Sequence, residues 1–334
     1  MHDRGIAFWL LACCALVFAM VVVGGVTRLT HSGLSIVEWQ PIVGAVPPLD
    51  EGAWQEAFGK YKATPEFREI NPGLDLDGFK RIFWWEYAHR LLGRLIGAAF
   101  LLPFLWFAVR GWFPRPLTWK LAGVFLLGGL QGALGWTMVQ SGLVDDPRVS
   151  QYRLAAHLGL ALLIYAAMLW IALDLLFPRG TETAPRSLRR FAFALVALVF
   201  VMAISGAFVA GIRAGLAYNS FPLMSGHWIP PGMFVIDPWY LNFFANVATV
   251  QFDHRLIAWL LAILVPWFWV RVRRAPVPPR GRLAADLLLA TLALQIALGI
   301  ATLLNTVPVP LAAAHQAGAL LVFSAALFAW HSLR

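Results

Sequence analysis

Eight long apolar segments constrain the fold of this chain more than any other feature of its sequence. A helix needs ~20 mostly apolar residues to cross a bilayer, where lipid gives backbone polar groups no hydrogen-bond partner. Of the 334 residues, 60% are hydrophobic and 13% are charged, whereas a soluble domain carries ~25% charged residues. We therefore predict an all-α integral membrane protein with eight transmembrane helices, at residues 6–24, 87–108, 118–139, 153–176, 190–212, 252–270, 284–304 and 311–331.

The basic residues between these segments predict the orientation of the chain. Cytoplasmic loops of membrane proteins collect Lys and Arg. One set of short connections carries twelve of them, whereas the opposite set carries only Arg148. We expect both termini in the cytoplasm, the long segments 25–86 and 213–251 outside, and no nucleic-acid partner despite the formal charge of +9. The twelve are Arg110, Arg115, Lys120, Arg179, Arg186, Arg189, Arg190, Arg271, Arg273, Arg274, Arg280 and Arg282.

The sequence also repeats itself after four apolar segments. Three short motifs occur twice in the same order: HRL at 89–91 and 254–256, QxALG at 131–135 and 295–299, and AAH at 155–157 and 313–315. Because four is an even number, the two copies have the same orientation in the membrane. We predict two pseudo-symmetric four-helix bundles related as a parallel repeat, with halves 1–178 and 179–334.

Four histidines inside the apolar segments are the first candidate functional residues. Ionisable groups within a membrane are costly and indicate function. His89 and His157 lie in one half, and His254 and His315 lie at matched places in the other. Two imidazoles on facing helices of a bundle suit the two axial positions of a haem iron. A hydrogen bond between helices, or a zinc or copper site, would also use such histidines.

The two halves differ at one acidic position. Glu86 precedes His89 by three residues, on the same helical face, whereas the matching residue before His254 is Gln251. A carboxyl group in only one half favours different roles for the two histidine pairs, although Glu86 could instead pair with Arg90. Four arginines near the external ends could bind haem propionates or extend to the membrane surface: Arg28, Arg90, Arg213 and Arg255.

With these motifs in view, the chain resembles the haem A synthases of the CtaA family. The resemblance covers nearly the whole chain in order and is carried by GGVTRLTHSGLS at 24–35, EYAHRLLGR at 86–94, AAHL at 155–158, NSFPLM at 219–224 and QFDHR at 251–255. Some bacterial members carry a cysteine pair in external loops. This chain has only Cys13 and Cys14, inside the first apolar segment, so it is similar to the cysteine-free proteobacterial and mitochondrial-like type.

The resemblance implies a function that the pattern of residues alone does not. Such enzymes oxidise the C8 methyl group of haem O to a formyl group by successive hydroxylations, giving haem A for cytochrome c oxidase. It implies a haem b cofactor on His254 and His315, and substrate haem O at His89 and His157 with Glu86 as the acidic residue. It further implies a bacterial inner membrane location and haem O synthase, an electron donor and the lipid bilayer as partners. A homo-oligomer is left open.

A membrane electron-transfer cytochrome with two b-type haems is the alternative function. It would use the same four histidines but modify no substrate. The presence of Glu86 in one half and Gln251 at the matched position of the other discriminates between the enzyme and the cytochrome. A pure electron carrier needs no carboxyl group beside one iron.

The Lys and Arg asymmetry gives the first testable prediction. Single cysteines introduced into residues 213–251 of a Cys13→Ala, Cys14→Ala background are expected to react with a membrane-impermeant thiol reagent added outside. Cysteines between the fourth and fifth segments should react only after the membrane is opened. If the cysteines in 213–251 reacted with the reagent only after the membrane was opened, the predicted orientation, with this segment outside, would be contradicted.

Overall fold

The computed structural model describes residues 2–40, 43–144, 147, 149–178 and 184–334. Within these ranges the secondary structure is helical, and the only extended pairing is a single bridge between Met224 and His227. Contacts divide the chain into two compact units, one of Met1–Cys14 with Leu158–Arg334 and one of Ala15–His157. These units are defined by contacts alone. The division into two functional halves, 1–178 and 179–334, stays a prediction.

The eight predicted transmembrane helices are confirmed within the described residues, and most extend beyond the predicted ends. Polar caps and prolines account for several of the extensions. The Asp75 side chain accepts the Gly78 N–H at the start of α4, Asn246 caps α9 in the same way, and prolines begin α10 and α11. The helices are α1 His2–Leu29, α4 Leu76–Val109, α5 Arg115–Val144, α6 Gln151–Leu176, α7 Arg186–Gly211, α9 Val247–Arg274, α10 Pro279–Leu304 and α11 Val309–Ser332.

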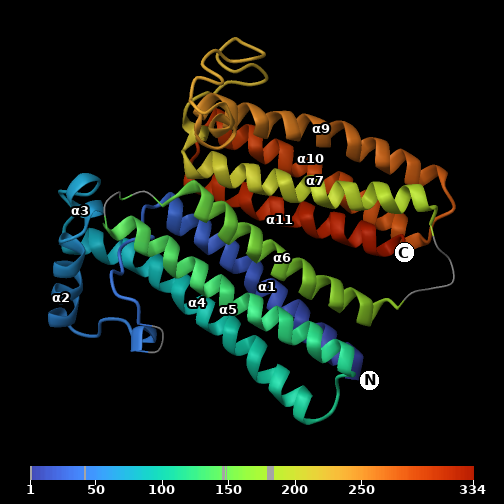
Figure 1. The fold of residues 1–334 in the computed structure, drawn as a ribbon, viewed down its shortest axis with the longest axis horizontal. Coiled ribbons are helices and arrows are strands. Elements are labelled where there is room, and N and C mark those ends of the chain that lie inside the picture. The colour runs from blue at the N-terminus through green and yellow to red at the C-terminus, as the bar shows by residue number, and fades with distance from the viewer. Residues whose placement is uncertain (1, 41–42, 145–146, 148, 179–183) are drawn as a thin grey trace. The chain divides into compact units, whose positions relative to one another are not determined.

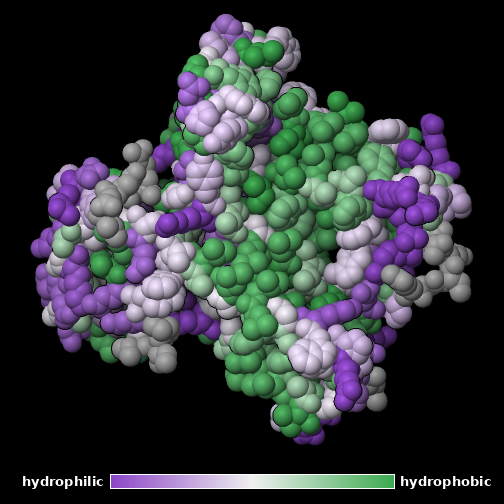
Figure 2. Space-filling view, in the orientation of Figure 1, coloured by the Kyte–Doolittle hydropathy of each residue, from purple (hydrophilic) through white to green (hydrophobic). Residues whose placement is uncertain are grey.

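The last four helices form a closed bundle (Figure 1). Helix α7 packs against α9 and α11, and α10 packs against the same two helices. Leu195, Phe268, Leu288 and Phe323 fill the interior and are at most 2% exposed. Hydrophobic residues cover the length of α7 and α9, and hydrophilic residues gather where α7 begins and α9 ends (Figure 2). This is the pattern of a bundle whose outer surface faces lipid.

Helix α6 joins this unit through its C-terminal part. The Tyr165 and Ser324 hydroxyls are 2.7 Å apart, and the rings of Trp170 and Trp330 lie 4.4 Å apart. Asp174, near the end of α6, accepts a hydrogen bond from the guanidinium of Arg334. These contacts hold α6 against α11.

In the unit Ala15–His157, two short helices form a cap on the first part of α4 (Figure 1). They are α2, Glu51–Lys62, and α3, Pro65–Glu69. Edge-to-face and tilted aromatic contacts join α2 to α4, and Phe67 of α3 packs edge-on against Tyr61 of α2. This cap is fixed by the aromatic cluster, which consists of Trp54, Phe58, Tyr61, Phe79 and Phe83.

The ends of α1 and α7 repeat each other in backbone conformation. His31 follows α1 with φ 53°, and Arg213 follows α7 with φ 56°. Few non-glycine residues adopt this left-handed conformation. Its occurrence 182 residues apart, beside the matched GLS and GLA motifs at 33–35 and 215–217, supports the internal repeat.

The second long connection differs in chemistry from the cap. It is built from the short helices η2 Ala214–Leu216, η3 Trp239–Leu241 and α8 Asn242–Ala245. Exposed aromatic and aliphatic side chains are frequent in it, including Trp228, Ile229 and Val235 at 70–72% exposure. Arg148 and Arg179, used above to predict orientation, lie outside the described residues.

Candidate functional site

Three of the four histidines occupy matched places at the start of their helices. His157, His254 and His315 are the seventh, eighth and seventh residues of α6, α9 and α11. His89 is the fourteenth residue of α4, because α4 begins with extra turns that carry part of the aromatic cluster. All four are therefore further from their helix starts than the apolar segments suggested.

A glycine on the preceding transmembrane helix lies against each imidazole ring. A methyl group added at the glycine would come within 2.8 Å of ring atom Cε1 in two pairs, and within 3.1 Å and 3.3 Å in the others. These approaches are closer than ordinary van der Waals contact, so glycine sets the position of each ring. The pairs are Gly24 with His89, Gly135 with His157, Gly206 with His254 and Gly299 with His315.

The ring nitrogens indicate which atom could bind a metal. Nδ1 of His254 lies 2.7 Å from the Ser205 hydroxyl. Nδ1 of His89, His157 and His315 is enclosed by protein and has no hydrogen-bond partner among the described residues. An enclosed nitrogen cannot reach an iron atom, so Nε2 is the atom left for coordination in each ring.

The structure brings the histidines together in the predicted pairs. Within the unit Ala15–His157, His157 lies close enough to His89 to influence it electrostatically, and within the other unit His315 lies close enough to His254 to do the same. No group of three or more metal-binding side chains occurs among the described residues. Among the described residues, neither pair of imidazoles is joined by a third His, Cys, Asp or Glu ligand, and two imidazoles alone suit haem iron.

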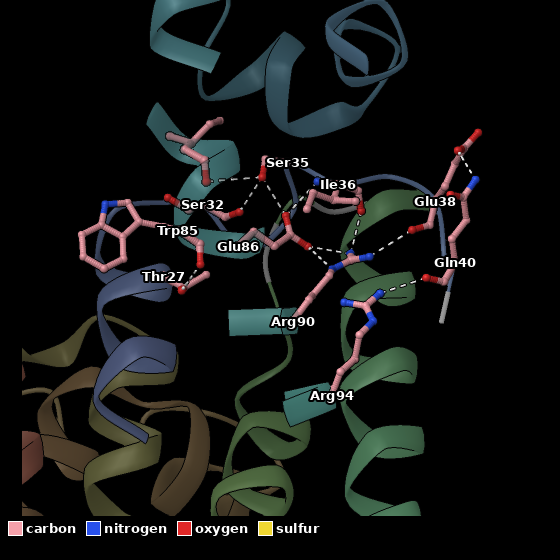
Figure 3. A network of polar contacts seen from close by, with 11 residues as sticks. Thr27, Ser32, Ser35, Ile36, Glu38, Gln40, Trp85, Glu86, Arg90 and Arg94 are labelled. Atoms are coloured by element: carbon pink, nitrogen blue, oxygen red, sulfur yellow. Dashed lines mark hydrogen bonds and ion pairs between the residues drawn. The ribbon is translucent and has the colours of Figure 1, made fainter. Parts of the chain in front are cut away.

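Glu86 lies at the centre of a polar network between α4 and the connection that follows α1 (Figure 3). Its side chain is buried at 2% exposure. Oε2 accepts hydrogen bonds from the Ser35 hydroxyl and the Ile36 N–H, both at 2.7 Å. Oε1 accepts from Nε and a terminal nitrogen of Arg90 at 2.9 and 2.6 Å. The predicted pairing with Arg90 is therefore present, and four donors suit a carboxylate.

Arg90 and Arg255 hold the two long connections in the same way. Arg90 donates to the carbonyls of Ile36 and Glu38 at 2.7 and 2.9 Å. Arg255 donates to the carbonyls of Tyr218 and Ser220 at the same two distances. Both pairs of carbonyls are separated by 182 residues, the same spacing as between the matched GLS and GLA motifs at 33–35 and 215–217. The terminal nitrogens of each guanidinium thus hold the long connection against the helix that carries the arginine, α4 for Arg90 and α9 for Arg255.

The two arginines differ in their acidic partner. Gln251 accepts one hydrogen bond from Arg255 at 3.2 Å and donates to the Ala214 carbonyl at 2.8 Å. Nε of Arg255 is buried without a partner among the described residues, whereas the same atom of Arg90 binds Glu86. Gln251 thus fixes its connection without supplying charge, and Arg255 keeps an unbalanced positive charge.

The other two predicted arginines end their helices. Arg28 lies in the last turn of α1, and Arg213 lies two residues after α7. Each makes interactions within the protein. Their contact with propionates stays a prediction.

A cavity of about 500 Å³ opens between the connection after α1, the end of α5 and the start of α6. This volume is within the range of small-molecule sites. Arg90, Arg153, Trp39 and Trp136 are among the residues that line it. Arg153 lies one turn before His157 and donates to the Thr137 carbonyl at 2.8 Å. Sequence reasoning missed Arg153 and Trp136, although the spacing from Arg153 to His157 could have indicated the first.

Comparison with known proteins decides the family. The COX15-CtaA family of cytochrome oxidase assembly proteins matches residues 7–327. The chain belongs to the COX15-CtaA family. Among curated members, it is 65% identical to the haem A synthase of Nitrosospira multiformis, over 99% of this chain and 94% of that protein. It is 58% identical to that of Nitrosomonas eutropha, over 98% and 93%, and 53% identical to that of Parvibaculum lavamentivorans, over 99% and 94%.

The contact between glycine and histidine in this COX15-CtaA member gives the second prediction. Gly299→Ala should favour the α10 helix by ~1 kcal/mol. It should nevertheless displace the His315 ring, since the new methyl group lies 2.8 Å from Cε1. We expect a folded protein that retains several-fold less haem. The control is Gly132→Ala in α5, where no atom lies within 4 Å of the added methyl. Equal haem content in both variants would show that the contact between Gly299 and the His315 ring is not needed for haem binding.

Proposed function

We infer that this chain is a membrane haem A synthase, an oxidoreductase that converts haem O to haem A in the assembly of cytochrome oxidase. Identity of 65% over nearly the full length of a curated haem A synthase carries this conclusion. The paired histidines support it, because imidazoles on facing helices of a bundle can serve as ligands of a haem iron. The direct test is conversion of added haem O to haem A by the purified protein.

We propose that His254 and His315 hold a resident haem b. Both rings lie within the closed bundle of α7, α9, α10 and α11, and each is positioned by a glycine. The unbalanced charge of Arg255 supports a negatively charged partner such as a propionate. The same role is less favoured for Arg90, whose guanidinium is already paired with Glu86.

The substrate haem O is assigned to His89 and His157. These residues lie in the unit that also contains Glu86 and the 500 Å³ cavity. The reason for this choice is the difference between Glu86 and Gln251. Glu86 and Gln251 each hydrogen-bond the long connection that packs on their helix. Since the amide of Gln251 does this, holding the connection does not require a carboxylate. The carboxylate of Glu86 therefore has a further role, and only the modified haem needs proton exchange nearby.

The chain's own residues would contribute binding, orientation and proton transfer. When bound, the two haems supply the iron and the electron transfer that oxidation of a methyl group requires. Gly24 and Gly135 fix the rings of His89 and His157, which orients the substrate. Glu86 takes up or releases a proton at a carboxylate oxygen, exchanging it with a donor such as Ser35.

The eight helices make this a multi-pass protein of a lipid bilayer. We propose the bacterial inner membrane, with both termini cytoplasmic. Because haem O is the substrate, an enzyme that makes haem O, a haem O synthase, is the expected supplier. An electron donor and a homo-oligomeric state remain part of this proposal.

The electron-transfer cytochrome remains the second candidate function. The matched geometry of the two histidine pairs favours it, since two similar sites could simply pass electrons. The Glu86 network disfavours it, because no second carboxylate occupies the matched position. A purified protein that binds two haems b and leaves haem O unchanged would support the cytochrome.

The third prediction concerns the proposed resident haem. His254→Ala and His315→Ala each remove one of the two residues that would hold this haem, so we expect loss of most tightly bound haem b from the purified protein. The pyridine haemochrome spectrum measures this content. The control is His227→Ala, in the exposed part of the second connection, which should keep it. Unchanged haem b in both ligand variants would refute the assignment.

The fourth prediction concerns Glu86. Glu86→Gln keeps the shape of the side chain but cannot exchange a proton, and general acid–base catalysis contributes ~10²–10⁴-fold. We expect the variant to retain haem and to lose haem O conversion by about that factor. Both are measured in one preparation, with Glu56→Gln in α2 as the surface control. Conversion at the wild-type rate would show that Glu86 only fixes the connection, and loss of all haem would show that it holds the fold.

A further inference from the structure

An exposed apolar patch covers part of the second long connection, residues 213–251. Its six large hydrophobic side chains are between 49% and 72% exposed. Between Arg213 and Gln251 only Asp237 carries a formal charge, whereas residues 51–69 of the cap include seven charged side chains. An apolar surface of this kind marks a place where lipid or protein binds. The apolar patch consists of Trp228, Ile229, Phe234, Val235, Trp239 and Tyr240.

Two buried asparagines hold the backbone of this connection together from inside. Oδ1 of Asn242 accepts the Ile236 N–H at 3.0 Å, and its Nδ2 donates to the carbonyls of Ile236 and Trp239, both at 2.8 Å. Nδ2 of Asn246 donates to the Gly232 carbonyl at 2.9 Å. The connection therefore satisfies these backbone groups internally and turns apolar side chains outward, which suits a segment in contact with lipid.

Aromatic contacts fix the shape of the apolar patch. The ring centroid of Phe243 lies 5.4 Å from that of Phe234 and 6.0 Å from that of Trp239, and both pairs meet edge to face. Phe234 has φ 58°, a backbone conformation that is rare for a bulky residue. Such a conformation persists only where the surrounding structure imposes it. The outward position of these rings is therefore built into the fold.

The apolar surface continues from the connection onto α9. The rings of Phe221 and Trp259 stack with their centroids 5.7 Å apart. Trp259, Ile263 and Trp267 are exposed and follow one another at four-residue spacing along α9, so they form one lipid-facing row. Figure 1 shows the connection projecting sideways from the start of α9, across the direction of the helix axes. Because transmembrane helices cross the bilayer, a segment in this direction lies along the membrane surface.

We propose that the apolar patch is an interfacial anchor, which inserts into the lipid leaflet beside α9 at the level of the headgroups and the first part of the acyl chains. Trp and Tyr are enriched at this level, because their rings are apolar and their N–H or O–H groups can reach water. Continuity with the lipid-facing row of α9 favours lipid over a protein partner as the occupant. Such an anchor fixes the depth and tilt of the bundle formed by α7, α9, α10 and α11. The inference does not depend on the proposed function.

The experiment measures the surroundings of two patch residues in the purified full-length protein, with one copy in each phosphatidylcholine nanodisc. Ile229→Cys and Val235→Cys, each in the Cys13→Ala, Cys14→Ala background, carry a nitroxide label. Paramagnetic resonance compares collisions of the label with oxygen, which concentrates in lipid, and with a nickel chelate, which stays in water. One copy in each disc excludes a second chain as the cover of the patch.

Two further positions calibrate this measurement. Ile263→Cys on α9 gives the value for lipid, and Glu56→Cys on the exposed face of α2 gives the value for water. We expect the ratio of oxygen to nickel collisions at both patch positions to exceed that of Glu56→Cys several-fold and to approach that of Ile263→Cys. A ratio equal to that of Glu56→Cys would place the patch in water, open to a protein partner, and would overturn the proposal. Few collisions with either agent would show that the chain itself covers the patch, and would overturn it as well.

A second measurement uses the unsubstituted protein and covers the case in which a labelled variant does not fold. Phosphatidylcholine with a photoreactive group near the top of one acyl chain is illuminated in the nanodisc, and mass spectrometry locates the cross-linked residues. We expect cross-links in residues 228–240 and in α9, but none in α2. Cross-links in α9 without any in 228–240 would overturn the proposal. Thiol reagents added outside, as in the orientation test, should react fastest at exposed polar positions such as Ser225.

Discussion

The lipid core gives a backbone polar group no partner outside its own helix, and this constraint determines most of the structure. It forces the chain into eight continuous helices and leaves variation to side chains and to the connections between helices. The functional side chains accordingly project from helices whose backbone is already satisfied. In four places a glycine then sets where an imidazole ring lies. The positions of the imidazole rings are therefore set by rigid helices and by glycines, whose lack of a Cβ atom lets each ring approach the neighbouring helix.

The internal repeat shows which parts of the site are structural and which are specific. Arg90 and Arg255 bind carbonyls at equivalent positions, with equal distances, so the fixing of each connection belongs to both copies. Glu86 and Gln251 share that role but differ in charge. The cap on the first copy, with its aromatic cluster, has no counterpart in the second connection. Glu86 and the cap both belong to the unit Ala15–His157, which contains one of the two histidine pairs.

The sequence predicted the eight helices from the lengths of its apolar segments, and it matched the histidines of the two copies from repeated motifs. Spans of about twenty apolar residues identify helices, and the repeated HRL and AAH motifs identify which histidines correspond. The extra turns of α4 were missed, because a polar, aromatic start such as residues 76–86 does not read as membrane-spanning. The glycine contacts were also missed, since glycine is abundant in this chain and only packing reveals which ones touch a ring.

The central claim is that the two histidine pairs hold haems with different roles, one a cofactor and one a substrate. Extraction and chromatographic separation of the haems from the purified wild-type protein tests this most directly. The account predicts haem b together with haem O or haem A. Two equivalents of haem b, unchanged when the protein is produced with abundant haem O, would contradict it.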